Sequence, residues 1–203
     1  QLGGRRAFLQ QPRTGAIEGI MSPIDPIHIR TARRADWEAV RRLATLVFSQ
    51  VDPKAIDYQI RSHYHLTRVA EGAGGQLLGY WLVDTGHAPG DARRLWLEQI
   101  AVDPAAQGRG VGSQLLRDLT DWARDRGYWR LELAVAASNL RAQNVYRKSG
   151  WIRVPRSGEG FTFRKEIESV DRSRPLIPIR RRFIVIRLLD RLLYGFRTRA
   201  AGK

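Results

Sequence analysis

Residues 95–126 read LWLEQIAVDPAAQGRGVGSQLLRDLTDWARDR, and this stretch decides the fold. Residues 95–102 predict a strand, which ends at the turn pair Asp103-Pro104. After the glycine-rich run QGRGVG, apolar residues recur at helical spacing and charged residues take the opposite face. Gly127 is suited to end that helix. The stretch therefore predicts a strand, a glycine-rich turn and a long amphipathic helix.

The glycine-rich turn has the chemistry of an anion site. The start of a helix leaves up to four backbone N–H groups unpaired and carries partial positive charge. Glycines 108, 110 and 112 let a bulky anion approach the backbone, and Arg109 adds a fixed charge. These features predict a phosphate cradle, with an ordinary tight strand–helix connection as the alternative. The spacing excludes a G-x-G-x-x-G fingerprint, and no Gly-Lys-Ser/Thr follows, so a P-loop is also excluded.

Outward from this stretch, the pattern is that of an α/β domain. Helices are expected after Asp36 as N-cap, over 55–65 and over 139–149, where Gly150 ends the last one. The expected strands are 27–30, 67–70, 76–83, 129–135 and 161–167. Residues 95–135 form a strand–helix–strand unit, so its two strands are expected to be parallel neighbours.

Composition narrows the class of protein. The 203 residues are 43% hydrophobic and 27% charged, which excludes wholesale disorder. There is no cysteine, so disulfide scaffolds, Cys-ligated zinc and thiol catalysis are excluded, and a reducing, cytoplasmic location is expected. The sequence has no run of about 18 apolar residues, so no membrane-spanning helix is expected.

Charge divides the chain into three parts. Residues 1–26 form a loose N-terminal segment of net charge +1, and Met21 suggests that residues 1–20 precede the natural start. Residues 27–168 form the domain and carry +6. Residues 169–203 carry +8 of the total of +15 and form a basic C-terminal extension. Most of the attraction for anionic partners therefore resides in this extension.

The extension contains a basic amphipathic stripe over residues 179–197. Bulky apolar side chains recur there at helical spacing, with arginines beside them. Three interpretations remain open for it. The first is packing on the protein's own surface or in a homodimer, and the second is peripheral contact with an anionic membrane. The third, contact with nucleic acid, is the least favoured.

Two motifs resemble the GNAT superfamily of N-acetyltransferases. The family's signature, Gln/Arg-x-x-Gly-x-Gly/Ala after a strand ending in a small apolar residue and Val, matches IAVDP at 100–104 followed by QGRGVG at 107–112. The second motif, Asn-x-x-Ala-x-x-x-Tyr-x-x-x-Gly-aromatic, matches residues 139–151 in register. A weaker match is the opening Ile29-Arg30-x-Ala32. The resemblance covers about residues 27–168.

The resemblance implies a mixed, mostly antiparallel central sheet with a splayed parallel strand pair, flanked by helices. Acetyl-CoA would lie in the gap between the strands 95–102 and 129–135. Its pantetheine arm would pair with the backbone of Ile100, Ala101 and Val102. The cofactor-binding residues implied at the turn and beyond are Gln107, Gly108, Arg109, Gly110, Val111, Gly112, Ser113 and Asn139. Asn139 is also suited to be an N-cap for the helix that follows it.

The same resemblance implies direct acyl transfer to a primary amine. Tyr146 would donate to the departing thiolate, and its alternative role is that of a core residue. An ammonium must lose a proton before it attacks, so a general base or a water relay is expected. Glu98 is the only carboxylate on its strand and is our candidate, with Glu132 in reserve. The alternative for Glu98 is a salt bridge with Arg93, Arg94 or Arg130.

The expected function is acetyl transfer from acetyl-CoA to a small-molecule or peptide amine in a ternary complex. The competing class is a non-catalytic acyl-CoA sensor or adaptor that works through the basic extension. No metal is expected, because the pair His63-x-His65 lacks further ligands at suitable spacing.

Overall fold

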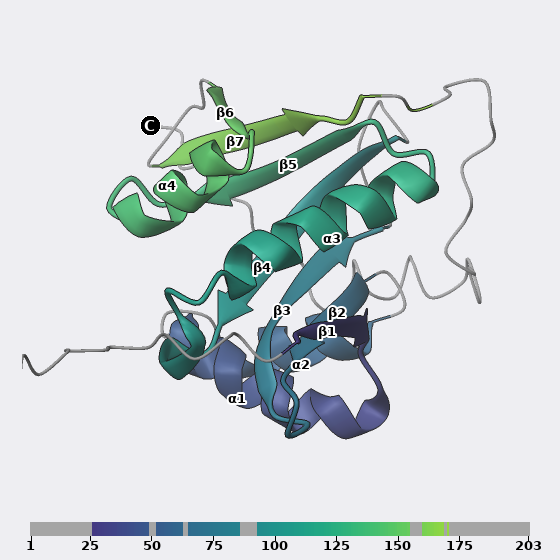
Figure 1. Ribbon diagram of the computed structural model, residues 1–203, viewed down its shortest axis with the longest axis vertical. Coiled ribbons are helices and arrows are strands. Elements are labelled where there is room, and N and C mark those ends of the chain that lie inside the picture. Colours follow the sequence, from purple (N-terminus) through teal and green to yellow (C-terminus); the bar gives the residue numbers. More distant parts are fainter. Residues whose placement is uncertain are drawn as a thin grey trace, which may run out of the picture.

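The described residues fold around a seven-stranded sheet (Figure 1). The structure, a computed structural model, describes residues 26–48, 52–62, 65–85, 93–154, 160–168 and 170. The strands are β1 (His28–Thr31), β2 (His65–Glu71), β3 (Leu77–Asp84), β4 (Arg94–Val102), β5 (Arg130–Val135), β6 (Ile152–Val154) and β7 (Phe161–Glu166). The helices are α1 (Trp37–Val47), α2 (Pro53–Arg61), α3 (Val111–Asp125) and α4 (Leu140–Lys148), with the 3₁₀ turns η1 (Arg34–Asp36) and η2 (Pro104–Ala106).

The strands lie in the order β1-β2-β3-β4-β5-β7-β6. Neighbouring strands are antiparallel except for β4 and β5, which are parallel and are joined through α3. This confirms the predicted α/β class, the mixed sheet and the parallel pair. It also shows that the glycine-rich turn, between β4 and α3, lies at the carboxyl end of a central strand.

Helices cover both faces of the sheet, so β3 is buried on each side. Trp81 and Val83 belong to the core beneath α3, which also includes Tyr146 of α4. Tyr80 and Leu82 belong to the second core, beneath α1 and α2. The alternation of β3 side chains between two cores explains its nearly continuous run of apolar residues.

The parallel pair separates soon after it begins. The register between β4 and β5 runs only from Arg94↔Arg130 to Trp96↔Glu132. Beyond that point β5 remains paired with β7 as far as Val135, and Figure 1 shows β4 and β5 diverging. Among the described residues, the edge of β4 that faces β5 therefore has no strand partner from residue 97 to residue 102.

The expected elements are present, with corrections at particular ends. The helix expected over 55–65 is α2, which begins at Pro53 because the Asp52 carboxylate accepts a hydrogen bond from the Lys54 N–H at 2.9 Å. Asp36 holds the N-cap position of α1, as expected, but its side chain makes no capping hydrogen bond to that helix. Its carboxylate instead accepts from the Arg33 N–H at 2.6 Å and pairs with Arg30 at 2.7 Å. The three-residue strand β6 was not predicted.

Some predictions concern residues outside the described ranges. These are the loose segment at 1–26 apart from Pro26, the basic extension apart from Val170, the stripe at 179–197, and His63. In the described part of the chain, none of the helices combines the length and hydrophobicity needed to cross a bilayer.

Candidate functional site

The glycine-rich turn leaves a row of backbone N–H groups without protein acceptors. Gly110 is the N-cap of α3, and no side chain caps the helix. The first hydrogen bond of the helix is from the Gln114 N–H to the Gly110 carbonyl, at 3.0 Å. Within the described residues, no carbonyl or side chain accepts from an N–H of residues 108–113. These groups can bind an anion at the positive end of the α3 dipole.

The turn is also open on its outer side. Gly108 and Gly110 have φ angles of +80° and +81°, which favour glycine, and an added Cβ at either would meet nothing within 4 Å. Gly112 lies inside α3, where a Cβ would come 3.6 Å from the Val102 side chain. Two of the glycines therefore shape the turn, and open space lies in front of both.

A β-bulge interrupts β4 at Glu98. Leu82 of β3 is opposite Gln99, whereas the next residue, Val83, is opposite Leu97, so Glu98 is the extra residue. Leu97 packs in the α3 core, and so do Ile100 and Val102 beyond the bulge. The bulge therefore shifts the side-chain alternation by one. Ala101 lies in the opposite core, as the alternation of residues 100–102 predicts.

Glu98 reaches solvent beside this bulge. Desolvation by the surrounding protein nevertheless raises the pKa of Glu98 to about 7. The negative charge of Asp84 raises this pKa further. None of the ion pairs between described residues includes Glu98. A carboxyl group that changes charge near neutral pH is suited to general base catalysis.

Two of the three arginines considered as salt-bridge partners of Glu98 pair with other carboxylates. Arg94 pairs with Glu132 at 3.2 Å and Arg130 pairs with Glu166 at 2.9 Å. Glu132, the reserve base, is 4% exposed and also accepts from Arg164 at 2.8 Å. The Glu132 carboxylate therefore links β5 to its two neighbours, β4 and β7.

Tyr146 lies in α4 with its ring in the α3 core. The ring centroid is 6.0 Å from that of Trp151 and 5.5 Å from that of Phe163. Burial raises the pKa of the phenol to about 12. The hydroxyl is therefore protonated near neutral pH, where it can act only as a hydrogen-bond donor or as a neutral acceptor. Its core role and a catalytic role are compatible, because the ring and the hydroxyl are different parts of the side chain.

Asn139 and Gln107 both make structural hydrogen bonds. The Asn139 side chain accepts from the Ala142 N–H at 3.0 Å, which confirms it as the N-cap of α4. Gln107 donates from Nε2 to the Val102 carbonyl at 3.2 Å, and its Oε1 accepts from Arg141. Arg141 was not among the predicted site residues. The only signal for it in the sequence is its place two residues after Asn139.

A series of hydrogen-bonded polar side chains behind the bulge was also not predicted from the sequence. The Tyr80 hydroxyl donates to Gln99 Oε1 at 2.6 Å, and Gln99 Nε2 donates to Gln59 Oε1. All three side chains are buried, and they come from β3, β4 and α2. Buried polar groups that satisfy one another fix the relative positions of their elements. This series therefore holds α2 against the bulged part of β4.

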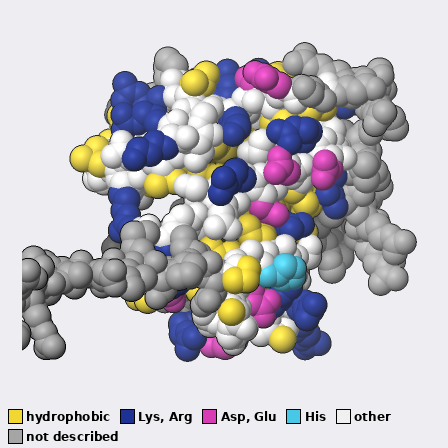
Figure 2. Space-filling view, in the orientation of Figure 1, with side chains coloured by type: hydrophobic (Ala, Val, Ile, Leu, Met, Phe, Trp, Pro, Cys, Tyr) yellow, Lys and Arg dark blue, Asp and Glu magenta, His cyan; other side chains and the backbone are white. Residues whose placement is uncertain are grey.

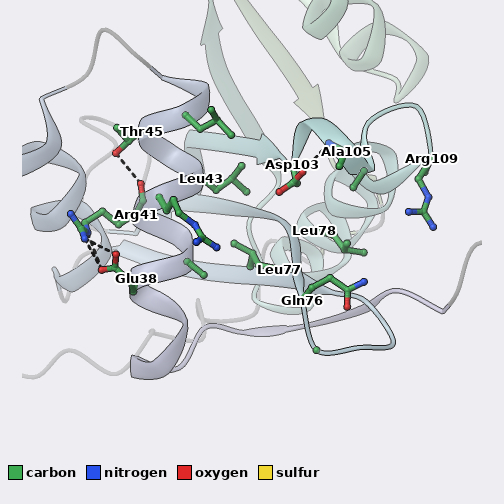
Figure 3. A pocket seen from close by; sticks show the side chains of 15 residues that line it. Glu38, Arg41, Leu43, Thr45, Gln76, Leu77, Leu78, Asp103, Ala105 and Arg109 are labelled. Carbon is green, nitrogen blue, oxygen red and sulfur yellow. Dashed lines mark hydrogen bonds and ion pairs between the residues drawn. The ribbon is translucent and has the colours of Figure 1, made fainter.

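A groove of about 1170 Å³ lies beside the turn, between α1, the start of β3 and η2 (Figure 3). Its lining includes Leu43, Leu77 and Leu78, and Arg109 projects at one end. Glu98 and Tyr146 do not line it. The groove therefore borders the turn but is separate from the two predicted catalytic residues.

In the described residues, no three His, Cys, Asp or Glu side chains gather as a metal site requires.

Comparisons with known proteins agree on one family. The profile of the acetyltransferase (GNAT) family matches residues 36–151. N-alpha-acetyltransferase RimI of Mycobacterium tuberculosis is 35% identical over 135 residues, which cover 64% of this chain and 81% of that protein. Streptothricin acetyltransferase of Streptomyces lavendulae is 39% identical over 85 residues, 42% of this chain and 43% of the relative.

A solved structure shares the fold. It is yncA from Salmonella typhimurium, a putative acetyltransferase with its cofactor acetyl-CoA, and it superposes with a TM-score of 0.59 at 20% identity. The alignment covers 70% of this chain and 95% of that one. The family profile matches more than half of this chain. The chain therefore belongs to the acetyltransferase (GNAT) family and is an N-acetyltransferase of that type.

Proposed function

We propose that this chain transfers the acetyl group of acetyl-CoA to a primary amine, by direct attack in a ternary complex. The observation that carries the proposal is the pairing of two features at one end of β4. These are the N–H groups of residues 108–113, which no described group accepts from, and the edge of residues 97–102, with which no described strand pairs. The N–H groups of the turn suit a diphosphate, and the strand edge suits an extended arm that contains amides.

The residues present fit coenzyme A. The turn offers unpaired N–H donors with open space in front of Gly108 and Gly110. The backbone of Ile100, Ala101 and Val102 would pair with the pantetheine amides as an added strand does. The Arg109 guanidinium, which is exposed, would face the phosphates. Asn139, at the start of α4, would complete the opposite wall of the gap.

Glu98 would prepare the acceptor for attack. An alkyl ammonium has a pKa of about 10.4, so most of a lysine-like acceptor is protonated near neutral pH. With a pKa of about 7, Glu98 is ionised in about half of the molecules at that pH. The carboxylate would take a proton from the ammonium, directly or through water. The neutral nitrogen would then attack the thioester carbonyl.

Backbone and phenol groups would stabilise the charge that develops on acyl transfer. A backbone N–H near the end of β4 would donate to the carbonyl oxygen as it becomes negative. The Tyr146 hydroxyl would donate to the sulfur as the C–S bond breaks. The absence of cysteine agrees with a route that forms no acyl-enzyme on a thiol.

The names of the two relatives refer to different acceptors, an alpha-amine and streptothricin. The net charge of +6 on residues 27–168 favours neutral or acidic amines over polycations. A homodimer, membrane contact through 179–197 and a cytoplasmic location stay predictions.

The experiment that tests this function measures thioester consumption. Purified protein and acetyl-CoA are incubated with a panel of amines, namely peptides with different N-termini, lysine peptides, polyamines, aminoglycosides and amino acids. We expect release of free CoA that depends on the amine, an acetylated product by mass spectrometry and intersecting initial-velocity lines. Binding of CoA without turnover on any amine would contradict catalysis and support a sensor.

A further inference from the structure

Arg141 bridges the open end of the gap between β4 and β5. Its Nη1 donates to Gln107 Oε1 at 2.5 Å, and Gln107 Nε2 donates to the Val102 carbonyl at 3.2 Å. Val102 and Gln107 belong to the β4 side of the gap, whereas Arg141 lies in the first turn of α4, which follows β5. This chain of hydrogen bonds therefore joins the two halves of the molecule next to the unpaired N–H groups of the turn.

Arg141 differs in its partner from most hydrogen-bonded arginines of the domain, although Arg147 likewise donates to a neutral oxygen, the Gln143 carbonyl. Most of those with hydrogen-bonded side chains pair with a carboxylate, namely Arg30, Arg41, Arg68, Arg94, Arg124, Arg130 and Arg164. Arg141 instead binds a neutral amide oxygen. Within the described residues, no carboxylate lies within ion-pair distance of it. Its positive charge is therefore uncompensated beside an anion cradle.

The guanidinium also has donors to spare. It carries five N–H donors in a rigid fork, and one hydrogen bond of Arg141 to a described residue uses one of them. The hydrogen bond to Gln107 fixes the fork at the mouth of the turn without neutralising it. Figure 2 shows Lys and Arg side chains gathered over the region of α4, where Arg141, Arg147 and Lys148 are exposed. A planar fork fixed in this way is suited to bind a phosphate oxygen.

We propose that Arg141 is a ligand of the diphosphate of coenzyme A and that Gln107 is its positioning residue. The inference rests on the proposed function, since it concerns the same coenzyme. In this arrangement the Gln107 side chain does not touch the phosphates. It holds Arg141 against the turn, so that the diphosphate is bound by N–H groups from the β4 side and by a guanidinium from the β5 side. Coenzyme binding thereby secures the two sides of the gap to each other.

The first test compares three ligands on wild type and Arg141→Gln by calorimetry. They are CoA, dephospho-CoA, which keeps the diphosphate but lacks the 3′-phosphate, and pantetheine, which lacks both. We expect R141Q to bind CoA and dephospho-CoA about tenfold more weakly and pantetheine unchanged, as loss of one charge-assisted hydrogen bond predicts. Arg141→Lys should recover part of the loss. An effect confined to CoA, or equal for all three ligands, would overturn the assignment.

Lys148→Gln is the matched control. Lys148 is an exposed cation in the last turn of the same helix, and neither the turn nor the gap involves it in the proposed binding. K148Q removes the same charge from α4 and should leave all three affinities within about twofold. If K148Q weakens CoA as much as R141Q does, the effect is one of net charge and the proposal is wrong.

The second test is a double-mutant cycle with Gln107→Ala. If Gln107 acts only by holding Arg141, Q107A should weaken CoA by about threefold in the wild type and by nothing further in R141Q. Additive losses would contradict the positioning role. The outcome for the wild type separates this inference from the proposed function. A wild type that binds no CoA contradicts both, whereas a wild type that binds CoA no better than R141Q contradicts this inference alone.

Discussion

Glu98 and Tyr146 have side-chain pKa values that suit opposite ends of one reaction. Both values lie above the ordinary range for their side chains, and in both cases burial is the largest cause. For Glu98 the shift brings the pKa to about 7, where the group exchanges protons near neutral pH. For Tyr146 it brings the pKa to about 12, where the group stays protonated. One residue is thus suited to accept a proton and the other to donate a hydrogen bond.

Replacing Glu98 by Gln should slow acetyl transfer and remove one limb of its pH profile. We expect kcat/KM of the wild type to rise with a midpoint near 7, as Glu98 ionises. In E98Q that limb should be absent and the rate about a hundredfold lower, a typical loss for a general base. The measurement is initial velocity against pH with one amine. A midpoint near 7 that persists in E98Q would assign the ionisation to another group.

The same substitution should stabilise the fold in alkaline solution. The pKa of Glu98 is higher in the folded protein than its ordinary value of 4.5, so the folded state binds the proton more tightly. Stability is therefore lost as pH rises from about 4.5 to 7, and E98Q is spared this loss. Thermal unfolding at about pH 8 should give a higher Tm for E98Q than for the wild type, with a smaller difference in acid.

Tyr146→Phe should separate binding from chemistry. The ring contacts with Trp151 and Phe163 remain in Y146F, so the fold and the affinity for CoA should change little. Loss of the hydroxyl should lower kcat by about a hundredfold if it donates to the departing sulfur. Rapid-quench measurement of acetyl transfer gives the rate, and calorimetry gives the affinity. Unchanged turnover would leave Tyr146 as a core residue only.

At the scale of elements, Asp118 ties α3 to the β2–β3 part of the sheet. Its carboxylate accepts from Arg68 Nη2 and from Trp81 Nε1, both at 2.8 Å. Burial raises the pKa of Asp118, opposed by the Trp81 hydrogen bond and by the charge of Arg68. Trp81 is fully buried, so its N–H depends on this partner. The contact sets the position of the helix whose first turn forms the anion cradle.

Asp118→Ala should therefore destabilise the domain by about 2 kcal/mol, since it leaves two buried or half-buried donors without their acceptor. Urea unfolding followed by tryptophan fluorescence measures the change. Asp121→Ala is the control, because Asp121 pairs with Arg124 on the exposed side of the same helix and its loss should cost less than about 0.5 kcal/mol. Equal effects of the two substitutions would show that the Asp118 contacts contribute nothing specific.

Periodicity predicted most elements because each has a clear apolar face. The amphipathic α3 and the end of that helix at Gly127, whose φ angle is +82°, could be predicted from the sequence. The β-bulge at Glu98 could not, because it depends on how β3 and β4 pair and leaves no mark in the residue pattern. The partners of Glu132 and of Arg141 were missed for the same reason. They lie on other elements, and only the folded chain brings them together.

At the scale of the whole molecule, the two halves of the sheet are joined at one end of the gap and separate at the other. At the joined end, Glu132 pairs with Arg94 on β4 and Arg164 on β7. At the open end, no ladder joins β4 and β5 in the described residues, and no described group accepts from the N–H groups of the turn. The division of the sheet thus creates a strand edge and a helix start next to each other, which is the arrangement an extended ligand with a phosphate group requires.

Calorimetric titration of coenzyme A into the wild type and into Gly110→Asp tests the central claim most directly. Asn at the same position is the control, because it matches Asp in size and in tolerance of the φ angle of +81° but adds no charge. We expect CoA to bind the wild type, to bind G110N more weakly, and to bind G110D about tenfold more weakly than G110N. No heat with the wild type, or equal affinities for G110N and G110D, would contradict a diphosphate bound by the amides of this turn.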